Sequence, residues 1–182
     1  VLVGENLGKV TNSFSIGDVE GDNKIGGLIG SNYDTVMDCY SRVSVLGENE
    51  VGGLVGTNNT RGIISRNYSS GSVSGTSNVG GLVGHNYYGT VSNSYSTSSV
   101  EGIDYIGGLI GKNYRGTVSN CYCTGLTMGT SNVGGLIGNN ENGVISSSYW
   151  NIETSGLATS AGGIGKIVAE MRHRTTFEDW DF

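Results

Sequence analysis

The 182-residue sequence has no proline, three cysteines, two histidines and few charged side chains, which make up 14% of it. Its 33 glycines follow no strict every-third-residue pattern, and together with the lack of proline this excludes a collagen. Because the cysteines (Cys39, Cys121 and Cys123) are odd in number, a disulfide scaffold is not expected. In the repeat described below, Cys39 and Cys121 lie three units apart, and Cys121 and Cys123 are too far apart in an extended strand, so we predict three free thiols. No apolar run approaches the roughly 18 residues of a membrane helix, so we expect no membrane insertion.

Positive charge is also scarce. Ten basic residues are spread thinly over a chain of net charge −6, which gives no basic stripe for a phosphate backbone, and we expect no nucleic acid partner. The sequence lacks HExxH, GxSxG, P-loop and GxGxxG motifs, so we expect no metal site, no cofactor and no catalytic residue. It begins at Val1 without a targeting segment, which indicates a fragment of a longer chain.

What the sequence does contain is an internal repeat of about 27 residues. The pentapeptide GGL[VI]G occurs five times, and we interpret GGIG at 162–165 as a degenerate further copy. One apolar residue marks each unit, at Leu2, Leu28, Leu54, Leu82, Leu109, Leu136 and Ile164. Such regularity is typical of an array of stacked units.

Other columns recur at fixed places in the unit. Asparagine follows the leucine by four residues, at Asn6, Asn32, Asn58, Asn86, Asn113 and Asn140. An aromatic column contains Phe14, Tyr40, Tyr68, Tyr95, Tyr122 and Tyr149. A glycine column, Gly21, Gly47, Gly75, Gly102 and Gly129, marks a turn. Each unit thus divides into three short segments rich in β-branched and aromatic residues.

These segments predict an all-β fold, a right-handed parallel β-solenoid of about six coils. We expect the leucines inside and the asparagine column turned inward as a structural ladder of stacked amides. A row of ligands for a cation or a sugar is the alternative for the asparagines.

The sequence divides into two regions. Residues 1–165 are expected to form the solenoid, and residues 166–182 a C-terminal cap that begins a truncated following region. Apolar and charged residues at helical spacing predict a short helix over 166–174 that covers the last coil. We expect His173 and Trp180 to be parts of this cap.

The tyrosine column is the candidate binding face. It shares one side of the chain with Asp38 and Arg66, which could pair across neighbouring coils, so we expect the rings to face outward. Stacked rings would stabilise the array, and an exposed row would offer a platform for sugars or a partner protein. The residues of this face are Tyr40, Tyr68, Tyr95, Tyr122 and Tyr149.

The five GGL[VI]G copies resemble the GLUG-motif repeat family, over nearly all of residues 1–165. The resemblance implies a module of a large secreted or surface-attached bacterial protein, such as an adhesin-like protein or the non-catalytic region of an immunoglobulin A1 peptidase. It implies a location outside the cell or on its surface. The segments YWNIETSG and SAGGIGK look like those that close such arrays.

The favoured hypothesis is a non-enzymatic, adhesin-like or structural module that presents other domains and binds glycans or host proteins. The hypothesis rests on the same residue types recurring in every unit, because a catalytic site needs residues that differ from the repeat at one place. One alternative is a passive spacer of a surface peptidase. The other is a carbohydrate-active β-helix enzyme, for which Asp34, Asp38, Arg42 and Arg66 are the candidates.

Overall fold

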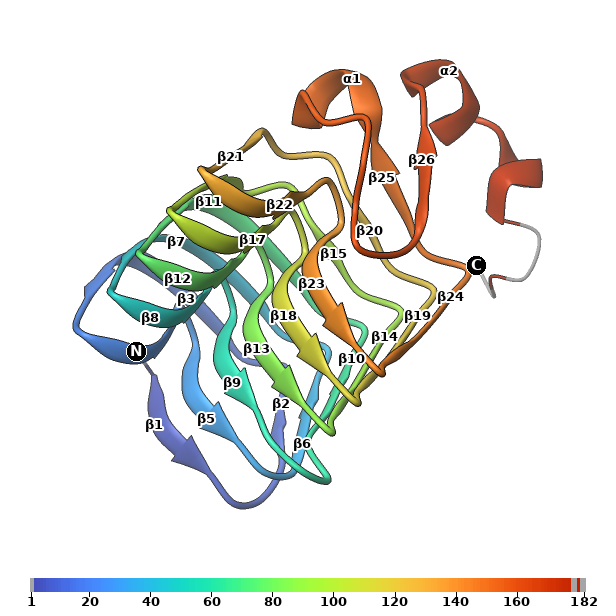
Figure 1. Cartoon of the computed structure of the whole chain (residues 1–182). Coiled ribbons are helices and arrows are strands. Elements are labelled where there is room, and N and C mark those ends of the chain that lie inside the picture. The colour runs from blue at the N-terminus through green and yellow to red at the C-terminus, as the bar shows by residue number, and fades with distance from the viewer. Residues whose placement is uncertain (1, 178–179, 181–182) are drawn as a thin grey trace.

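The computed structural model describes residues 2–177 and residue 180. The chain winds through five complete coils and a sixth that ends in short helices, with the N-terminus at the opposite end (Figure 1). Strands of successive coils pair in parallel, with equivalent residues of the repeat opposite one another. This confirms the predicted all-β parallel solenoid with a short C-terminal cap. The right-handed winding stays a prediction.

Four parallel sheets form the sides of the coils. Sheet A contains β1 (Val3–Asn6), β5 (Ile29–Asn32), β9 (Val55–Asn58), β13 (Val83–Tyr87), β18 (Ile110–Tyr114) and β23 (Ile137–Glu141). Sheet B contains β2 (Val10–Thr11), β6 (Thr35–Met37), β10 (Ile63–Ser65), β14 (Thr90–Ser92), β19 (Thr117–Ser119) and β24 (Val144–Ser146).

Sheets C and D complete each coil. Sheet C contains β3 (Phe14–Glu20), β7 (Tyr40–Leu46), β11 (Tyr68–Ser74), β15 (Tyr95–Ser96), β16 (Ser99–Glu101), β20 (Tyr122–Cys123), β21 (Thr127–Met128), β25 (Tyr149–Asn151) and β26 (Ile164–Lys166). Sheet D contains β4 (Asn23–Gly26), β8 (Asn49–Gly52), β12 (Ser77–Gly80), β17 (Asp104–Gly107) and β22 (Ser131–Gly134). In coils 4 and 5 the sheet C strand is interrupted, so that β11 pairs with both β15 and β16.

The prediction of three segments per unit is wrong, because each complete coil has four sides. The GGL[VI]G pentapeptide is a corner, and its leucine lies between sheets D and A. A Cβ atom on Gly81 would overlap the carbonyl oxygen of Gly108 and the side chain of Ser96, and one on Gly84 would lie 2.5 Å from the backbone of Glu50. The motif is therefore the place where the backbones of neighbouring sides touch, and only glycine fits there.

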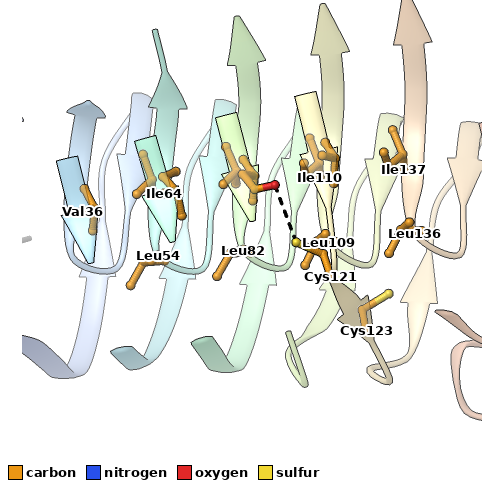
Figure 2. Close-up of a cluster of buried hydrophobic side chains, with 14 of the residues drawn as sticks. Val36, Leu54, Ile64, Leu82, Leu109, Ile110, Cys121, Cys123, Leu136 and Ile137 are labelled. Carbon is orange, nitrogen blue, oxygen red and sulfur yellow. Dashed lines mark hydrogen bonds between the residues drawn. The ribbon is translucent and has the colours of Figure 1, made fainter. Parts of the chain in front are cut away.

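The leucine column forms the centre of the main core, as predicted. Its buried members, Leu28, Leu54, Leu82, Leu109 and Leu136, lie beside isoleucine and valine side chains of sheets A and B (Figure 2). A smaller core between sheets C and D contains Val45, Val51, Val73, Val79, Val100 and Ile106. Each fully buried side chain of this kind stabilises the fold by about 1.5–3 kcal/mol.

The GGIG segment is not a further copy of the corner. Ile164 in β26 pairs with Tyr149 in sheet C and is 54% exposed, so it lies outside the leucine column. The chain has already left the repeat path after β25, where α1 (Ile152–Ser155) begins.

The C-terminal cap is less helical than predicted. α2 (Val168–Met171) and the 3₁₀ helix η1 (Arg174–Phe177) replace one helix over 166–174, and Lys166 belongs instead to β26, where it pairs with Asn151 in sheet C. The Trp180 indole donates a hydrogen bond to the carbonyl of Ser147 at 3.1 Å. Residues 178, 179, 181 and 182 of the predicted cap lie outside the described residues.

None of the described helices is long and apolar enough to cross a membrane.

Trp150 closes the core at this end. It occupies the position of small, buried residues in the earlier coils, which are Ser41, Ser69, Ser96 and Cys123. Its ring lies against Gly135, and its Nε1 donates to the carbonyl of Leu157 at 3.0 Å. Ser160 Oγ accepts hydrogen bonds from the amides of Leu136 and Ile137 at 3.2 and 2.9 Å, so it takes the place of a further coil.

Candidate binding surfaces

An aromatic row runs along the outer face of sheet C. It contains Phe14, Tyr40, Tyr68, Tyr95, Tyr122 and Tyr149, one from each coil. The residues that follow Tyr40 and Tyr68, Ser41 and Ser69, point inward and are fully buried, so strand alternation turns the rings outward. From Phe14 to Tyr122, successive ring centroids lie 4.9–5.2 Å apart, with planes within 7° of parallel.

This stacking covers the faces of the rings. The centroids of Tyr40 and Tyr68 are 5.0 Å apart at an interplanar angle of 7°. Two rings lying side by side in one plane could not approach so closely, so they overlap face to face. In the middle of the row, a ligand therefore meets ring edges and phenol hydroxyls instead of ring faces.

The last two members of the row are covered by the C-terminal segment. The ring of Phe177 lies 5.4 Å from Tyr149 and 6.4 Å from Tyr122, and Trp180 lies 5.9 Å from Tyr122. Burial raises the pKa of the Tyr122 hydroxyl. The open part of the row consists of Phe14, Tyr40, Tyr68 and Tyr95.

Arg42 adds a cation to the open part of the row. Its guanidinium carbon lies 5.2 Å from the centroid of Tyr40, and its Nη2 donates to the hydroxyl of Tyr68 at 3.0 Å. The hydrogen bond with Tyr68 is the main cause that raises the pKa of Arg42. The outer face of sheet C thus combines phenol hydroxyls with an exposed guanidinium.

The six asparagines form a ladder at the corner between sheets A and B. The Nδ2 of every member but the last donates to the Oδ1 of the next coil at 2.7–2.8 Å, in the order Asn6, Asn32, Asn58, Asn86, Asn113 and Asn140. Each inner Nδ2 also donates to a carbonyl of the following turn, as Asn86 does to Gly89 at 3.1 Å. The four amides between the end members are fully buried. Because they are already paired within the protein, the geometry favours a structural role over ligand binding.

The four residues considered for a carbohydrate-active site do not converge. Asp38 and Arg66 form an ion pair with two hydrogen bonds, at 2.8 and 2.9 Å, and the guanidinium lowers the pKa of Asp38. Arg42 belongs to the tyrosine row instead. Asp34 lies in the turn between β5 and β6, at the other end of β6 from Asp38.

A second aromatic cluster, which the columns did not reveal, lies in the turns from sheet A to sheet B. We define the tyrosine–arginine ridge as Arg61, Tyr87, Tyr88, Tyr114 and Arg115. Tyr87 and Tyr114 stack at 5.4 Å, and Tyr88 lies edge-on to them at 4.8 and 5.5 Å. Arg115 donates to the Tyr88 hydroxyl at 3.1 Å. The dipeptides Tyr-Tyr and Tyr-Arg at equivalent places in two units are the sequence signal for this cluster.

A polar cluster lies beside the ridge. His85 Nδ1 is 3.2 Å from Glu50 Oε1, and Thr57 donates to Glu50 Oε2 at 2.6 Å. The hydrogen bond from His85 is the main cause that lowers the pKa of Glu50. Over residues 2–177 and Trp180, no group of three or more His, Cys, Asp or Glu could hold a metal ion.

The cysteines are core residues. All three are buried free thiols, and Cys121 Sγ lies 3.1 Å from the carbonyl of Ser119 and 3.8 Å from that of Val91, the contact dashed in Figure 2. Burial raises the pKa of Cys121 to about 12 and also raises that of Cys123. At neutral pH both thiols are therefore protonated and poor nucleophiles.

Comparison with protein families supports the resemblance seen in the repeat. A family model described as "The GLUG motif" matches residues 75–101 and 104–127. The first match includes β12 to β16, and the second includes β17 to β20 and the first residue of β21. Two successive coils thus carry GLUG motifs, and the chain is similar to the GLUG-motif repeat family. Comparisons with curated proteins and with solved structures gave no match.

Proposed function

We propose that this β-solenoid with GLUG motifs is a non-enzymatic module of a secreted or surface-attached bacterial protein, where it projects or presents other domains. The observation that carries the proposal is the asparagine ladder, which joins all six coils through one chain of buried hydrogen bonds. With parallel pairing on every side, this ladder couples each coil to the next and makes the module stiff. A GLUG solenoid is a module of non-catalytic type, which agrees with this role.

The location can be tested directly. Antibodies against this chain should label intact cells of the source organism or detect the protein in the culture medium. Labelling that requires permeabilised cells would contradict a surface or secreted location.

The open part of the tyrosine row is the proposed contact for glycans or host proteins. Because the ring faces are covered, the contact would use the hydroxyls of Tyr40, Tyr68 and Tyr95, supported by Arg42. The triple variant Y40F/Y68F/Y95F keeps the stack and removes only these hydroxyls. Its binding to a glycan array and to host cells should fall at an unchanged melting temperature, while Tyr33→Phe, in another turn, should bind like the wild type.

The same experiment separates the alternatives. Undiminished binding by the triple variant would remove the row from the contact, and no binding by the wild-type protein would favour a passive spacer. A carbohydrate-active enzyme is the remaining candidate, and release of reducing sugars from acidic or neutral polysaccharides would overturn the non-enzymatic proposal.

A further inference from the structure

We propose that the tyrosine–arginine ridge binds a linear anionic polysaccharide, one that carries carboxylate or sulfate groups. The ridge lies on the sheet A to sheet B corner and is separate from the tyrosine row on sheet C. The inference therefore extends the proposed surface function to a second face, and it is tested independently of the first.

The ridge gathers positive charge on a chain that is acidic overall. Arg61, Lys112 and Arg115 supply three of the ten basic residues at or beside it, although the chain has a net charge of −6. Lys112 pairs with Glu141 at 3.6 Å, the acidic residue that limits the ridge on the side of coil 6. Among the described residues, no carboxylate lies within ion-pair distance of Arg61 or Arg115. Both arginines are exposed and are available to an anion.

The residues of the ridge are aligned along the solenoid axis. Arg61, Tyr88 and Arg115 each precede the glycine that begins the turn into sheet B, and the strands that follow pair in register. With coils about 4.8 Å apart, the backbones of Arg61 and Arg115 lie about 10 Å apart, with that of Tyr88 between them. A linear polymer lying along the axis would meet a cation, a ring and a second cation in order.

The backbone at these positions favours other residue types. Arg61, Tyr88 and Arg115 have φ of 74°, 57° and 52°, in the left-handed region that glycine and asparagine adopt most readily. In coil 6 this position is held by Asn142, at φ 55°. The left-handed conformation at this position belongs to the repeat, because Asn142 adopts it as well, and in coils 3 to 5 the sequence places two cations and a ring there.

Two rings of the ridge are more exposed than the tyrosines of the row on sheet C. Tyr87 and Tyr88 are each 39% exposed, and Tyr88 stands nearly perpendicular to its neighbours. The Tyr87–Tyr114 stack is two rings long, because Asn59 and Glu141 occupy the equivalent positions in coils 3 and 6. Exposed rings with guanidinium donors suit the apolar faces, hydroxyls and anionic groups of a charged sugar.

Calorimetric titration with alginate oligomers, dextran sulfate and neutral dextran tests the proposal. The wild-type protein should bind at least one anionic polymer, more weakly at high salt, and should not bind dextran. The variant R61Q/R115Q should bind roughly tenfold more weakly. The control R172Q/R174Q removes the same charge at two exposed positions of the C-terminal segment and should bind within about twofold of the wild type.

The three polymers also separate the possible outcomes. Preference for alginate or for dextran sulfate identifies carboxylate or sulfate as the anionic group. Equal affinity for dextran, an equal loss in R172Q/R174Q, or no binding of either anionic polymer would overturn the proposal. The variant Y40F/Y68F/Y95F should bind the anionic polymer like the wild type, so the proposed function and this inference can fail separately.

Discussion

The first and last coils of this chain belong to the same repeat but differ in how much apolar surface they expose. In coil 1, Leu2, Phe14 and Ile16 are 58%, 55% and 67% exposed, and β1 is the outer strand of sheet A. In coil 6, Trp150 is 5% exposed and Ser160 bonds the amides at the start of β23. The comparison shows that the apolar side chains of the repeat are fully buried in a coil that has a neighbouring coil on each side. Coil 6 is covered where the sequence departs from the repeat, at Trp150 and Ser160.

The largest expected effect is at the closed end. Trp150→Ala should lower the free energy of unfolding by about 3–5 kcal/mol, because it removes a buried aromatic ring at the end of the core. Ile16→Ala, at the open end, should change it by no more than about 0.5 kcal/mol. Urea unfolding of the two variants measures the difference, and similar losses would contradict the contrast between the ends.

The asparagine ladder gives the next comparison. Asn86→Leu leaves Asn58 without its amide acceptor and Asn113 without its donor, so we expect a loss of about 2–3 kcal/mol. Asn6→Leu affects the ladder only at Asn32 and should cost about 1 kcal/mol. Thermal unfolding measures both, and equal melting temperatures would count against a cooperative ladder.

A matched pair of glycine substitutions tests the packing of the corners. A methyl group on Gly81 would meet the backbone of Gly108, whereas one on Gly4 would have no neighbour within 4 Å. Gly81→Ala should therefore destabilise by about 1–3 kcal/mol. Gly4→Ala should be neutral or slightly stabilising in the same unfolding assay, and a tolerated Gly81→Ala would show that the corner can relax.

The buried thiols predict a small effect of alkaline pH. The pKa of Cys121 is about 12 in the folded state and near 9 when unfolded, so the unfolded chain loses this proton first. Stability should fall as the pH rises above about 9, by about 1 kcal/mol per thiol at pH 10. The free energy of unfolding of the variant C121A/C123A should depend less on pH between pH 8 and 10 than that of the wild type. Identical slopes would show that the thiols are accessible to solvent.

The main features of the fold could be predicted because they recur in every unit. In-register parallel pairing places equal residues above one another, so the columns of Leu82 and Asn86 indicated a core and a ladder. The corners were harder, since a glycine that ends a strand and one that turns a corner look alike in sequence. The four-sided coil was therefore missed, and Ile164 was placed in the wrong column.

The candidate surfaces, too, could be predicted only in part from the sequence. The outward direction of the tyrosines followed from strand alternation, but the overlap of their faces depends on ring tilt, which a sequence does not specify. The ridge was missed because its equivalent positions hold different residue types, Arg61, Tyr88 and Arg115. Comparing equivalent positions of the repeat reveals residues that recur, whereas this surface is formed by residues that differ between units.

The central claim is that continuous ladders join the coils of this chain and that Trp150 and Ser160 cover the last coil. Leucine amides supply one probe per coil: those of Leu2, Leu28, Leu54, Leu82 and Leu109 each donate to a leucine carbonyl of the next coil at 2.9–3.0 Å, and that of Leu136 donates to Ser160. Hydrogen exchange of the [¹⁵N]leucine-labelled protein should be fastest at Leu2, slower at Leu28 and slowest from Leu54 to Leu136. Exchange at Leu136 as fast as at Leu2, or one uniform rate for all six, would contradict the account.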